Sequence, residues 1–181
     1  MNLEKYQQYS RIARGLEKAD LVLKDARIVN VFTEEIIRGD IAIQDGIIAG
    51  IGSFHGKEER DLAGRYVCPG FIDSHLHLES TLVTPAELVT AASRHGTTTF
   101  IVDPHESANV SGLAGVDYIL DQTENVKANV YVMMPSCVPA TAIDDNGCTL
   151  TAGDMAPYLH NSRILGLGEV MDSISVVQGE K

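Results

Sequence analysis

The sequence predicts an α/β fold, because strand-like and helix-like segments alternate along the chain after Tyr66. Residues 97–102 form a continuous β-branched and apolar run, which is typical of a strand buried on both faces. Residues 110–122 carry apolar side chains at helical spacing, and residues 129–134 and 163–168 are again strand-like. We therefore expect a parallel sheet flanked by helices in this part of the chain.

Two further helices are expected in the same part. Thr84 suits the N-cap of a helix, Pro85 its first position and Glu87 its first turn, so a helix is predicted from there to about Arg94. Residues 154–160 predict a second, short helix. Residues 135–150 contain Pro, Ser, Thr, Asp and Gly, and we expect them to form a long loop between a strand and this short helix.

The residues before Tyr66 predict a helix followed by a small β-rich region. Leu3 to Lys18 has an imperfect apolar stripe at helical spacing. Short β segments follow at residues 20–24, 27–32, 36–43 and 47–51, with a hairpin turn at Asp45-Gly46. Residues 52–64 are charged and contain glycine, so they are expected to form a solvated loop.

Two histidines, His75 and His77, end an apolar run that begins at Val67. Alternate side chains of a strand share a face, so Asp73, His75 and His77 would lie on one side of an extended segment. Two neutral imidazoles on one face can hold a metal ion such as zinc, iron, nickel or copper. The alternative for an isolated His-x-His pair is two polar residues near the end of a strand.

The stretch Pro69-Gly70-Phe71-Ile72-Asp73-x-His75-x-His77 resembles the opening of the amidohydrolase superfamily of metal-dependent hydrolases. Within that superfamily, three further stretches resemble the adenine deaminases, which convert adenine to hypoxanthine and ammonia in purine salvage. They are Leu78-Glu79-Ser80-Thr81-Leu82, Asp103-Pro104-His105-Glu106 and Gly166-Leu167-Gly168-Glu169-Val170-Met171.

The resemblance implies that the fold is the N-terminal part of a TIM-like (β/α)8 barrel, preceded by part of a small β-sandwich. A complete barrel takes about 250 residues, more than this chain has, and about four βα units fit after residue 66. The expected domains are an N-terminal helix at 1–18, a partial β-sandwich at 19–65 and the first half of the barrel at 66–181.

The resemblance also implies roles for three residues, and position at the end of a barrel strand predicts roles for three more. His75, His77 and Glu169 would bind a binuclear divalent metal centre, with Glu169 bridging the ions where many amidohydrolases have a carboxylated lysine. The metal is expected to be manganese or iron, with zinc as the alternative. His105 and Glu106 are the expected catalytic residues, and Asp103 is expected to bind substrate, because barrel active sites lie where the strands end. The alternative for Asp103 and Glu106 is capping of a helix that begins near Ser107 or Asn109.

Two other functions remain open on the sequence alone. The chain could come from an amidohydrolase that acts on a cyclic amide, as dihydroorotase and hydantoinase do, although Glu169 replaces the lysine expected there. It could also be a partial barrel without catalytic function. Because the family's other metal histidines and its proton-transferring aspartate lie on later strands, the 181-residue chain alone is expected to be inactive and to bind metal weakly.

The charge of the chain argues against nucleic-acid and membrane partners. The formal net charge is −11 and the pI is about 4.8, whereas polyanions are held mainly by Lys and Arg. The three cysteines are scattered and predict neither a disulfide framework nor a cysteine metal site. With no secretion signal or membrane span apparent, we expect a cytoplasmic enzyme that takes a small purine substrate and forms a homo-oligomer.

Overall fold

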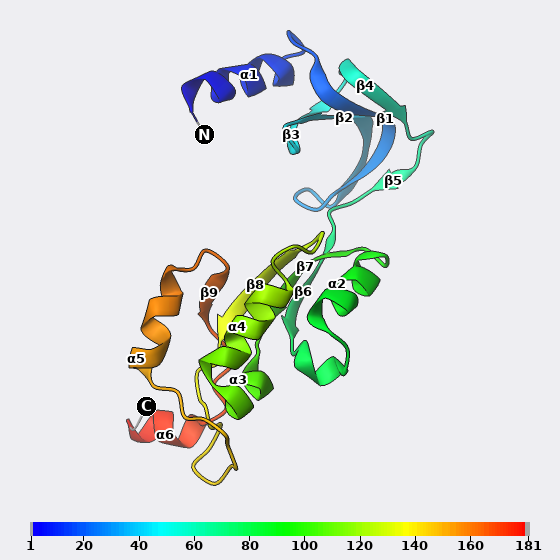
Figure 1. Cartoon of the computed structure of the whole chain (residues 1–181). Coiled ribbons are helices and arrows are strands. Elements are labelled where there is room, and N and C mark those ends of the chain that lie inside the picture. The colour runs from blue at the N-terminus through cyan, green and yellow to red at the C-terminus, as the bar shows by residue number, and fades with distance from the viewer. Residues whose placement is uncertain (1, 180–181) are drawn as a thin grey trace. The chain divides into compact units, whose positions relative to one another are not determined.

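The computed structural model describes residues 2–179, and the chain divides into two compact units between Pro69 and Gly70 (Figure 1). The first unit holds a helix and a mixed sheet, and the second holds a parallel sheet with its helices. This boundary lies a few residues after the one expected from the sequence. Within the described residues, no helix has the length and apolar character needed to cross a bilayer.

The sheet of the first unit has the strand order β3-β2-β1-β4, with β5 also paired to β1. The β1–β2 and β2–β3 pairs are antiparallel, and the hairpin between β2 and β3 turns at Asp45-Gly46, where both φ angles are positive. The two β segments expected at 20–24 and 27–32 form one strand, with an irregularity between Leu23 and Ala26. The strands are β1 (Ala19–Asn30), β2 (Glu35–Gln44), β3 (Ile47–Gly52), β4 (Gly56–Asp61) and β5 (Tyr66–Val67).

Strand β4 lies where the sequence predicted a solvated loop, so that prediction was wrong. Its backbone pairs in parallel with β1, while five of its six residues are exposed. Because the charged side chains face solvent, the segment has no apolar pattern that could mark it as a strand. The pairing of its backbone with a neighbour distant in sequence determines its structure.

Helix α1 (Leu3–Ala13) is shorter than the expected helix, which extended to Lys18. The side chain of Asn2 caps its start by accepting the backbone N–H of Lys5 at 2.9 Å. Gly15 has a φ of +70° shortly after the helix ends, a conformation that glycine adopts without strain. Ile12 is fully buried and packs in a cluster with side chains of the sheet.

The second unit contains a four-stranded sheet in the order β6-β7-β8-β9, and all its pairs are parallel. The strands β7 and β8 coincide with the predicted runs, and β9 is slightly shorter than predicted. Parallel strands in sequence order place all their carboxyl ends at one edge of the sheet. The strands are β6 (Phe71–Leu76), β7 (Thr97–Val102), β8 (Asn129–Met134) and β9 (Ile164–Leu167).

The core of this unit lies between helices and alternate side chains of the strands. Val102, Val132 and Met134 are buried against apolar residues of α2 (Pro85–Ser93) and α4 (Leu113–Gln122). The intervening strand residues are only half-buried or exposed, and β7 shows this alternation. The expectation that β7 is buried on both faces was therefore wrong for the residues described, because helices cover one face of its sheet.

The helix expected at 110–122 is two helices, α3 (His105–Ser111) and α4, which meet at Gly112. Gly112 has φ +63° and ψ −139°, and a Cβ atom there would lie 2.5 Å from the Sγ atom of Cys148. Only glycine fits this conformation and this space. His105 and Glu106 lie in the first turn of the earlier helix, α3.

The remaining helical segments are short. The helix predicted at 154–160 is α5 followed by a 3-10 turn, and α6 was not predicted. Thr151 and Asp154 form a capping box at the start of α5. The segments are η1 (Glu79–Thr81), α5 (Ala152–Met155), η2 (Ala156–His160) and α6 (Ser173–Gln178).

Candidate metal centre

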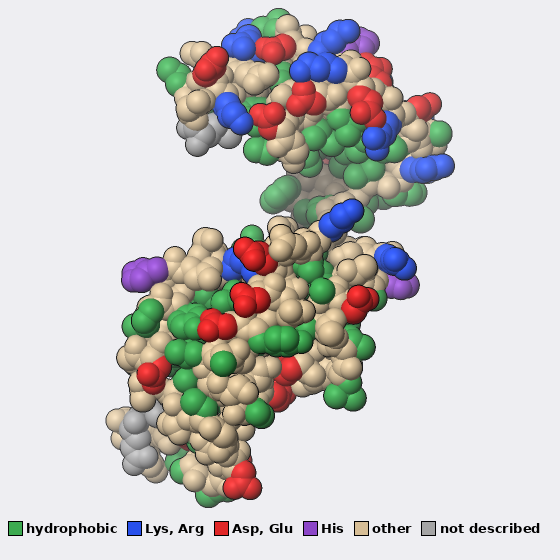
Figure 2. All heavy atoms as spheres, in the orientation of Figure 1, with side chains coloured by type: hydrophobic (Ala, Val, Ile, Leu, Met, Phe, Trp, Pro, Cys, Tyr) green, Lys and Arg blue, Asp and Glu red, His purple; other side chains and the backbone are tan. Residues whose placement is uncertain are grey.

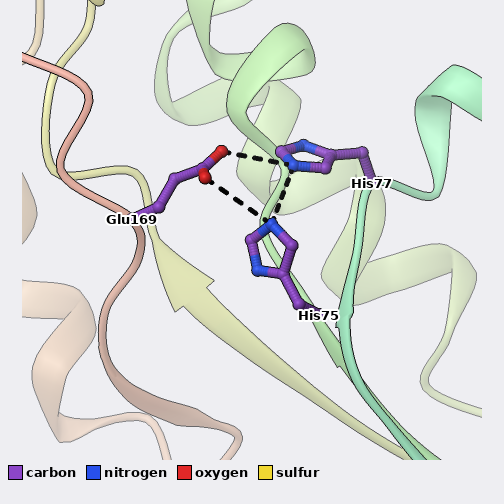
Figure 3. Close-up of side chains that lie close together, drawn as sticks. All are labelled: His75, His77 and Glu169. Carbon is purple, nitrogen blue, oxygen red and sulfur yellow. Dashed lines mark hydrogen bonds and ion pairs between the residues drawn. The ribbon is translucent and has the colours of Figure 1, made fainter.

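Three of the predicted site residues come together at the carboxyl edge of the parallel sheet. His75 is the second-to-last residue of β6, and His77 directly follows the strand. Their Nε2 atoms are 3.1 Å apart. Glu169 follows β9, with Oε2 3.8 Å from Nε2 of His75 and Oε1 3.4 Å from Nε2 of His77. Figure 3 shows the three side chains pointing toward one another.

This cluster depends on the strand order. Glu169 is more than ninety positions after His75 in the chain, and β7 and β8 lie between the strands that carry them. Because all four strands are parallel, residues that follow β6 and β9 reach the same edge of the sheet.

The donor set fits a divalent metal ion. His75, His77 and Glu169 each offer one ligand atom, and these atoms all lie within 4.8 Å of one another. Imidazole nitrogen and carboxylate oxygen are common ligands of zinc, iron and manganese. The two carboxylate oxygens of Glu169 face different imidazoles, which suits a ligand shared between two ions.

Glu106 orients His77 from the side opposite to Glu169. Nδ1 of His77 lies 2.9 Å from Oε2 of Glu106, and a carboxylate can only accept, so Nδ1 donates its proton there. The lone pair of neutral His77 is then on Nε2, which faces Glu169. Partial burial opposes the charge of Glu106, but hydrogen bonds from its own backbone and from Ser80, together with His77, lower its pKa.

Glu79 lies beside this cluster, although the sequence predicted no role for it. His77, Glu79 and Glu106 form a second group whose ligand atoms lie within 4.8 Å of one another. Oε1 of Glu79 accepts the backbone N–H of Ser107 at 3.1 Å, which ties η1 to the first turn of α3. Burial, together with the nearby carboxylate of Glu106, raises the pKa of Glu79. The signals in the sequence were its position two residues after His77 and its place in the stretch Leu78-Glu79-Ser80-Thr81-Leu82.

Asp103 lies beneath Glu169 and is fully buried. Its Oδ2 atom accepts the backbone N–H of Glu169 at 3.1 Å. Burial raises the pKa of Asp103, although the N–H of Glu169 and the imidazoles of His77 and His105 act in the opposite direction. Its contact is thus with the main chain of a predicted metal ligand.

A cavity of about 540 Å³ opens beside the cluster. His105 and Glu106 both line it, and His105 is only 7% exposed, with Nδ1 unpaired among the described residues. Asp103 is not part of the lining. The residues around the cavity are His77, His105, Glu106, Asn109, Val110, Ala140, Asp144, Asp145, Glu169 and Met171.

The sequence of the second unit matches a known family. The profile of the amidohydrolase family aligns with residues 66–170, which is more than half of the chain and includes all six predicted site residues. The chain belongs to the amidohydrolase family. The parallel sheet and the cluster at its carboxyl edge both lie within the part of the chain that matches.

Curated relatives of this amidohydrolase chain include adenine deaminases from several bacteria. The chain is 56% identical to adenine deaminase of Desulfitobacterium hafniense over 181 residues, which are 100% of this chain and 32% of that protein. It is 50% identical to adenine deaminase of Geobacillus kaustophilus over 155 residues, 86% of this chain and 27% of that protein. The chain therefore spans about a third of the length of these relatives.

A solved structure confirms the fold of the amidohydrolase chain. N-acyl-D-glutamate deacylase of Bordetella bronchiseptica, crystallised with zinc and a phosphonate inhibitor, aligns with a TM-score of 0.50 at 22% identity. The alignment covers 77% of this chain and 34% of that protein. The predicted α/β fold, a partial barrel preceded by a sheet region, is thereby confirmed.

Proposed function

We propose that this chain supplies part of the active site of a metal-dependent adenine deaminase, which hydrolyses adenine to hypoxanthine and ammonia. The observation that carries the proposal is the convergence of His75, His77 and Glu169 on one point from two separate strands. The identity to adenine deaminases over the whole chain supports this substrate.

The proposed centre is held by the three clustered side chains. His75 and His77 contribute Nε2 atoms, and Glu169 contributes one oxygen toward each imidazole. A pair of divalent ions bound there supplies Lewis-acid activation of water at neutral pH. Glu106 keeps the proton of His77 on Nδ1, so that the Nε2 lone pair stays available.

Proton transfer to the leaving amine is the second task. Ammonia leaves C6 of the purine only if a proton reaches the amine, which is general acid catalysis. His105 and Glu106 line the cavity and are the groups of this chain that we assign to hold and move that proton. His105 is suited to it because its Nδ1 atom has no partner among the described residues.

The charge around the cavity favours a neutral base as substrate. Four carboxylates line the cavity, and neither lysine nor arginine is among the lining residues. Basic side chains are also sparse over the second unit in Figure 2, and its described residues include only Arg94, Lys127 and Arg163. The lining residues of this chain therefore offer no basic side chain to pair with the carboxylate of a substrate such as dihydroorotate.

We propose manganese or iron as the metal, with zinc as the alternative, since all three accept imidazole and carboxylate ligands. A homo-oligomeric assembly and a cytoplasmic location stay predictions of the sequence, as do the absence of nucleic-acid and membrane partners.

Substrate assays test the proposal. The polypeptide encoded by the complete reading frame, called the full-length polypeptide below, is purified with Mn²⁺ and tested for ammonia release from adenine. Dihydroorotate and hydantoin serve as competing substrates for the cyclic-amide alternative. Turnover of adenine alone is the expected result. Hydrolysis of either cyclic amide without turnover of adenine would replace the proposed function, and no turnover of any substrate would favour a non-catalytic role.

A further inference from the structure

We propose that Asp103 is a positioning residue, which fixes the main chain of Glu169 so that its carboxylate reaches both histidines, and that Gly168 is required to make room for it. This inference rests on the proposed metal centre. It assigns Asp103 a role through Glu169 in place of the substrate contact expected from the sequence.

The first argument is the burial of Asp103. The side chain is fully buried, and a buried carboxylate is retained only where it makes compensating hydrogen bonds. Among residues 2–179, its one such bond runs from the backbone N–H of Glu169 to Oδ2, at 3.1 Å. The other oxygen, Oδ1, has no partner among the residues that the structure describes.

The second argument is that Asp103 lies away from the cavity. His105 and Glu106, which follow it closely, line the cavity of about 540 Å³, whereas Asp103 does not. A side chain that is buried beneath the site and bonded to the main chain of a ligand acts on the position of that ligand.

The third argument is the way in which the segment around Glu169 is held. The N–H of Gly168 donates to the carbonyl of Met134 at 2.7 Å, and the carbonyl of Glu169 accepts the hydroxyl of Ser136 at 2.6 Å. Asp103 provides the contact to the N–H of Glu169 between these two. The ends of two strands, β7 and β8, therefore fix the backbone that presents Glu169, and Asp103 brings in β7, which does not pair with β9.

Gly168 provides an independent observation for the same contact. A Cβ atom at position 168 would lie 2.0 Å from Oδ2 of Asp103, far inside van der Waals contact. The φ angle of Gly168 is not in the left-handed region, so alanine is excluded by this one side chain and not by backbone strain.

Mn²⁺ binding by the full-length polypeptide tests the inference, with free Mn²⁺ measured by electron paramagnetic resonance. Loss of a residue that supports a metal ligand typically lowers metal affinity about 10- to 100-fold. We expect Asp103→Ala and Gly168→Ala each to weaken Mn²⁺ binding by about that factor. Asp103→Asn keeps an acceptor oxygen and should retain affinity within about threefold of wild type.

A double mutant separates positioning from general damage to the fold. In the Asp103→Ala background, Gly168→Ala no longer meets the carboxylate, so its additional effect on Mn²⁺ affinity should vanish. Thr123→Ala is the matched control, because Thr123 is a buried polar residue at the opposite end of the sheet. It should lower the unfolding temperature without changing Mn²⁺ affinity.

The outcomes are distinct from those of the substrate assays. Wild-type affinity in Asp103→Ala, or additive losses in the double mutant, would overturn the positioning role even if adenine is deaminated. Failure to deaminate adenine would overturn the proposed substrate alone, since the Mn²⁺ comparison is made without substrate. If the wild-type polypeptide binds none of Mn²⁺, Fe²⁺ and Zn²⁺, both the centre and the role of Asp103 are wrong.

Discussion

Glu169 is the residue whose side chain connects the two outer strands of the parallel sheet. Its carboxylate follows β9, and its oxygens face the imidazoles of His75 and His77 at the end of β6. An amide of the same shape has only one acceptor oxygen and no charge to offset two dications.

Glu169→Gln should therefore abolish most of the activity and weaken Mn²⁺ binding by roughly 100-fold, the upper end of the effect of losing a supporting residue. Ammonia release and bound Mn²⁺ in the full-length polypeptide measure the two effects. Glu87→Gln changes an exposed carboxylate of α2 and should change neither. Full metal occupancy in Glu169→Gln would contradict the assignment of Glu169 as a ligand.

Arg163 is a structural residue at the opposite end of the sheet. Its guanidinium donates to the carbonyls of Val130 and Leu120, at 3.0 and 2.8 Å, and to the hydroxyl of Thr123. Burial lowers the pKa of Arg163. The N–H groups of its planar guanidinium are nevertheless hydrogen-bonded to these three acceptors.

Arg163→Met keeps the apolar stem but removes the three hydrogen bonds that the guanidinium donates, so the free energy of unfolding should fall by about 2–4 kcal/mol. Urea unfolding of the full-length polypeptide measures this loss. Arg94→Met removes an exposed guanidinium from the end of α2 and should leave stability nearly unchanged. Equal stability of the two variants would show that the buried hydrogen bonds contribute little.

At the scale of the elements, Tyr158 ties η2 to α4. Its hydroxyl donates to Oδ1 of Asp117 at 2.6 Å. Burial and the adjacent carboxylate raise the pKa of Tyr158 from 10.0 to about 12. A raised pKa means that the folded state favours the protonated hydroxyl. The stabilisation is therefore complete below pH 10.0 and disappears as the pH rises toward about 12.

Tyr158→Phe removes this pH-dependent contribution. The difference in unfolding free energy between wild type and Tyr158→Phe should be constant up to pH 10.0 and shrink as the pH approaches about 12. Urea unfolding at a series of alkaline pH values measures it, with Tyr118→Phe on α4 as the control. A difference that does not change over this range would contradict the contact between Tyr158 and Asp117.

The elements that the sequence predicted well are those whose side chains alone determine their structure. β7, β8 and α2 have strong apolar patterns or capping residues, and they begin and end close to the predicted residues. β4 and the division between α3 and α4 were missed. β4 depends on backbone pairing with β1, and Gly112 combines a positive φ with the close approach of Cys148, a residue distant in sequence that no local pattern indicates.

The residues of the site also differ in whether local sequence or contacts distant in sequence reveal them. His75 and His77 are close in sequence, and their spacing indicated the centre directly. Glu169 was assigned through a family resemblance, and the structure brings it to the histidines, although its role as a ligand stays a prediction. The contacts of Glu79 with Ser107 and of Ser136 with Glu169 could not be predicted, because each joins residues that only the folded chain brings together.

At the scale of the whole molecule, the outer strands of the parallel sheet expose apolar side chains. Phe71 and Ile72 on β6 are 60% and 64% exposed, and Leu165 and Leu167 on β9 are 52% and 54% exposed. Within the described residues, each of these strands pairs on one side only. Unpaired edges with apolar side chains favour association with other chains.

The 181-residue chain, expressed alone, should therefore self-associate, release no ammonia from adenine and bind Mn²⁺ weakly, having three ligands for a two-metal centre. Light scattering over a range of concentrations, with the same ammonia and Mn²⁺ assays, measures these properties. Enzyme-like turnover by the isolated chain would show that it contains the complete site. A monomer at every concentration would show that the exposed edges do not drive association.

The close approach of Gly168 to Asp103 limits how this part of the sequence can diverge. A methyl group at position 168 is compatible only with a smaller side chain at position 103, and an aspartate at 103 permits only glycine at 168. A change at position 168 alone is therefore sterically disfavoured, whereas Asp103 can be replaced alone by a side chain of equal or smaller size that still accepts the N–H of Glu169. The constraint between the two codons is thus expected to act in one direction, from Asp103 on position 168.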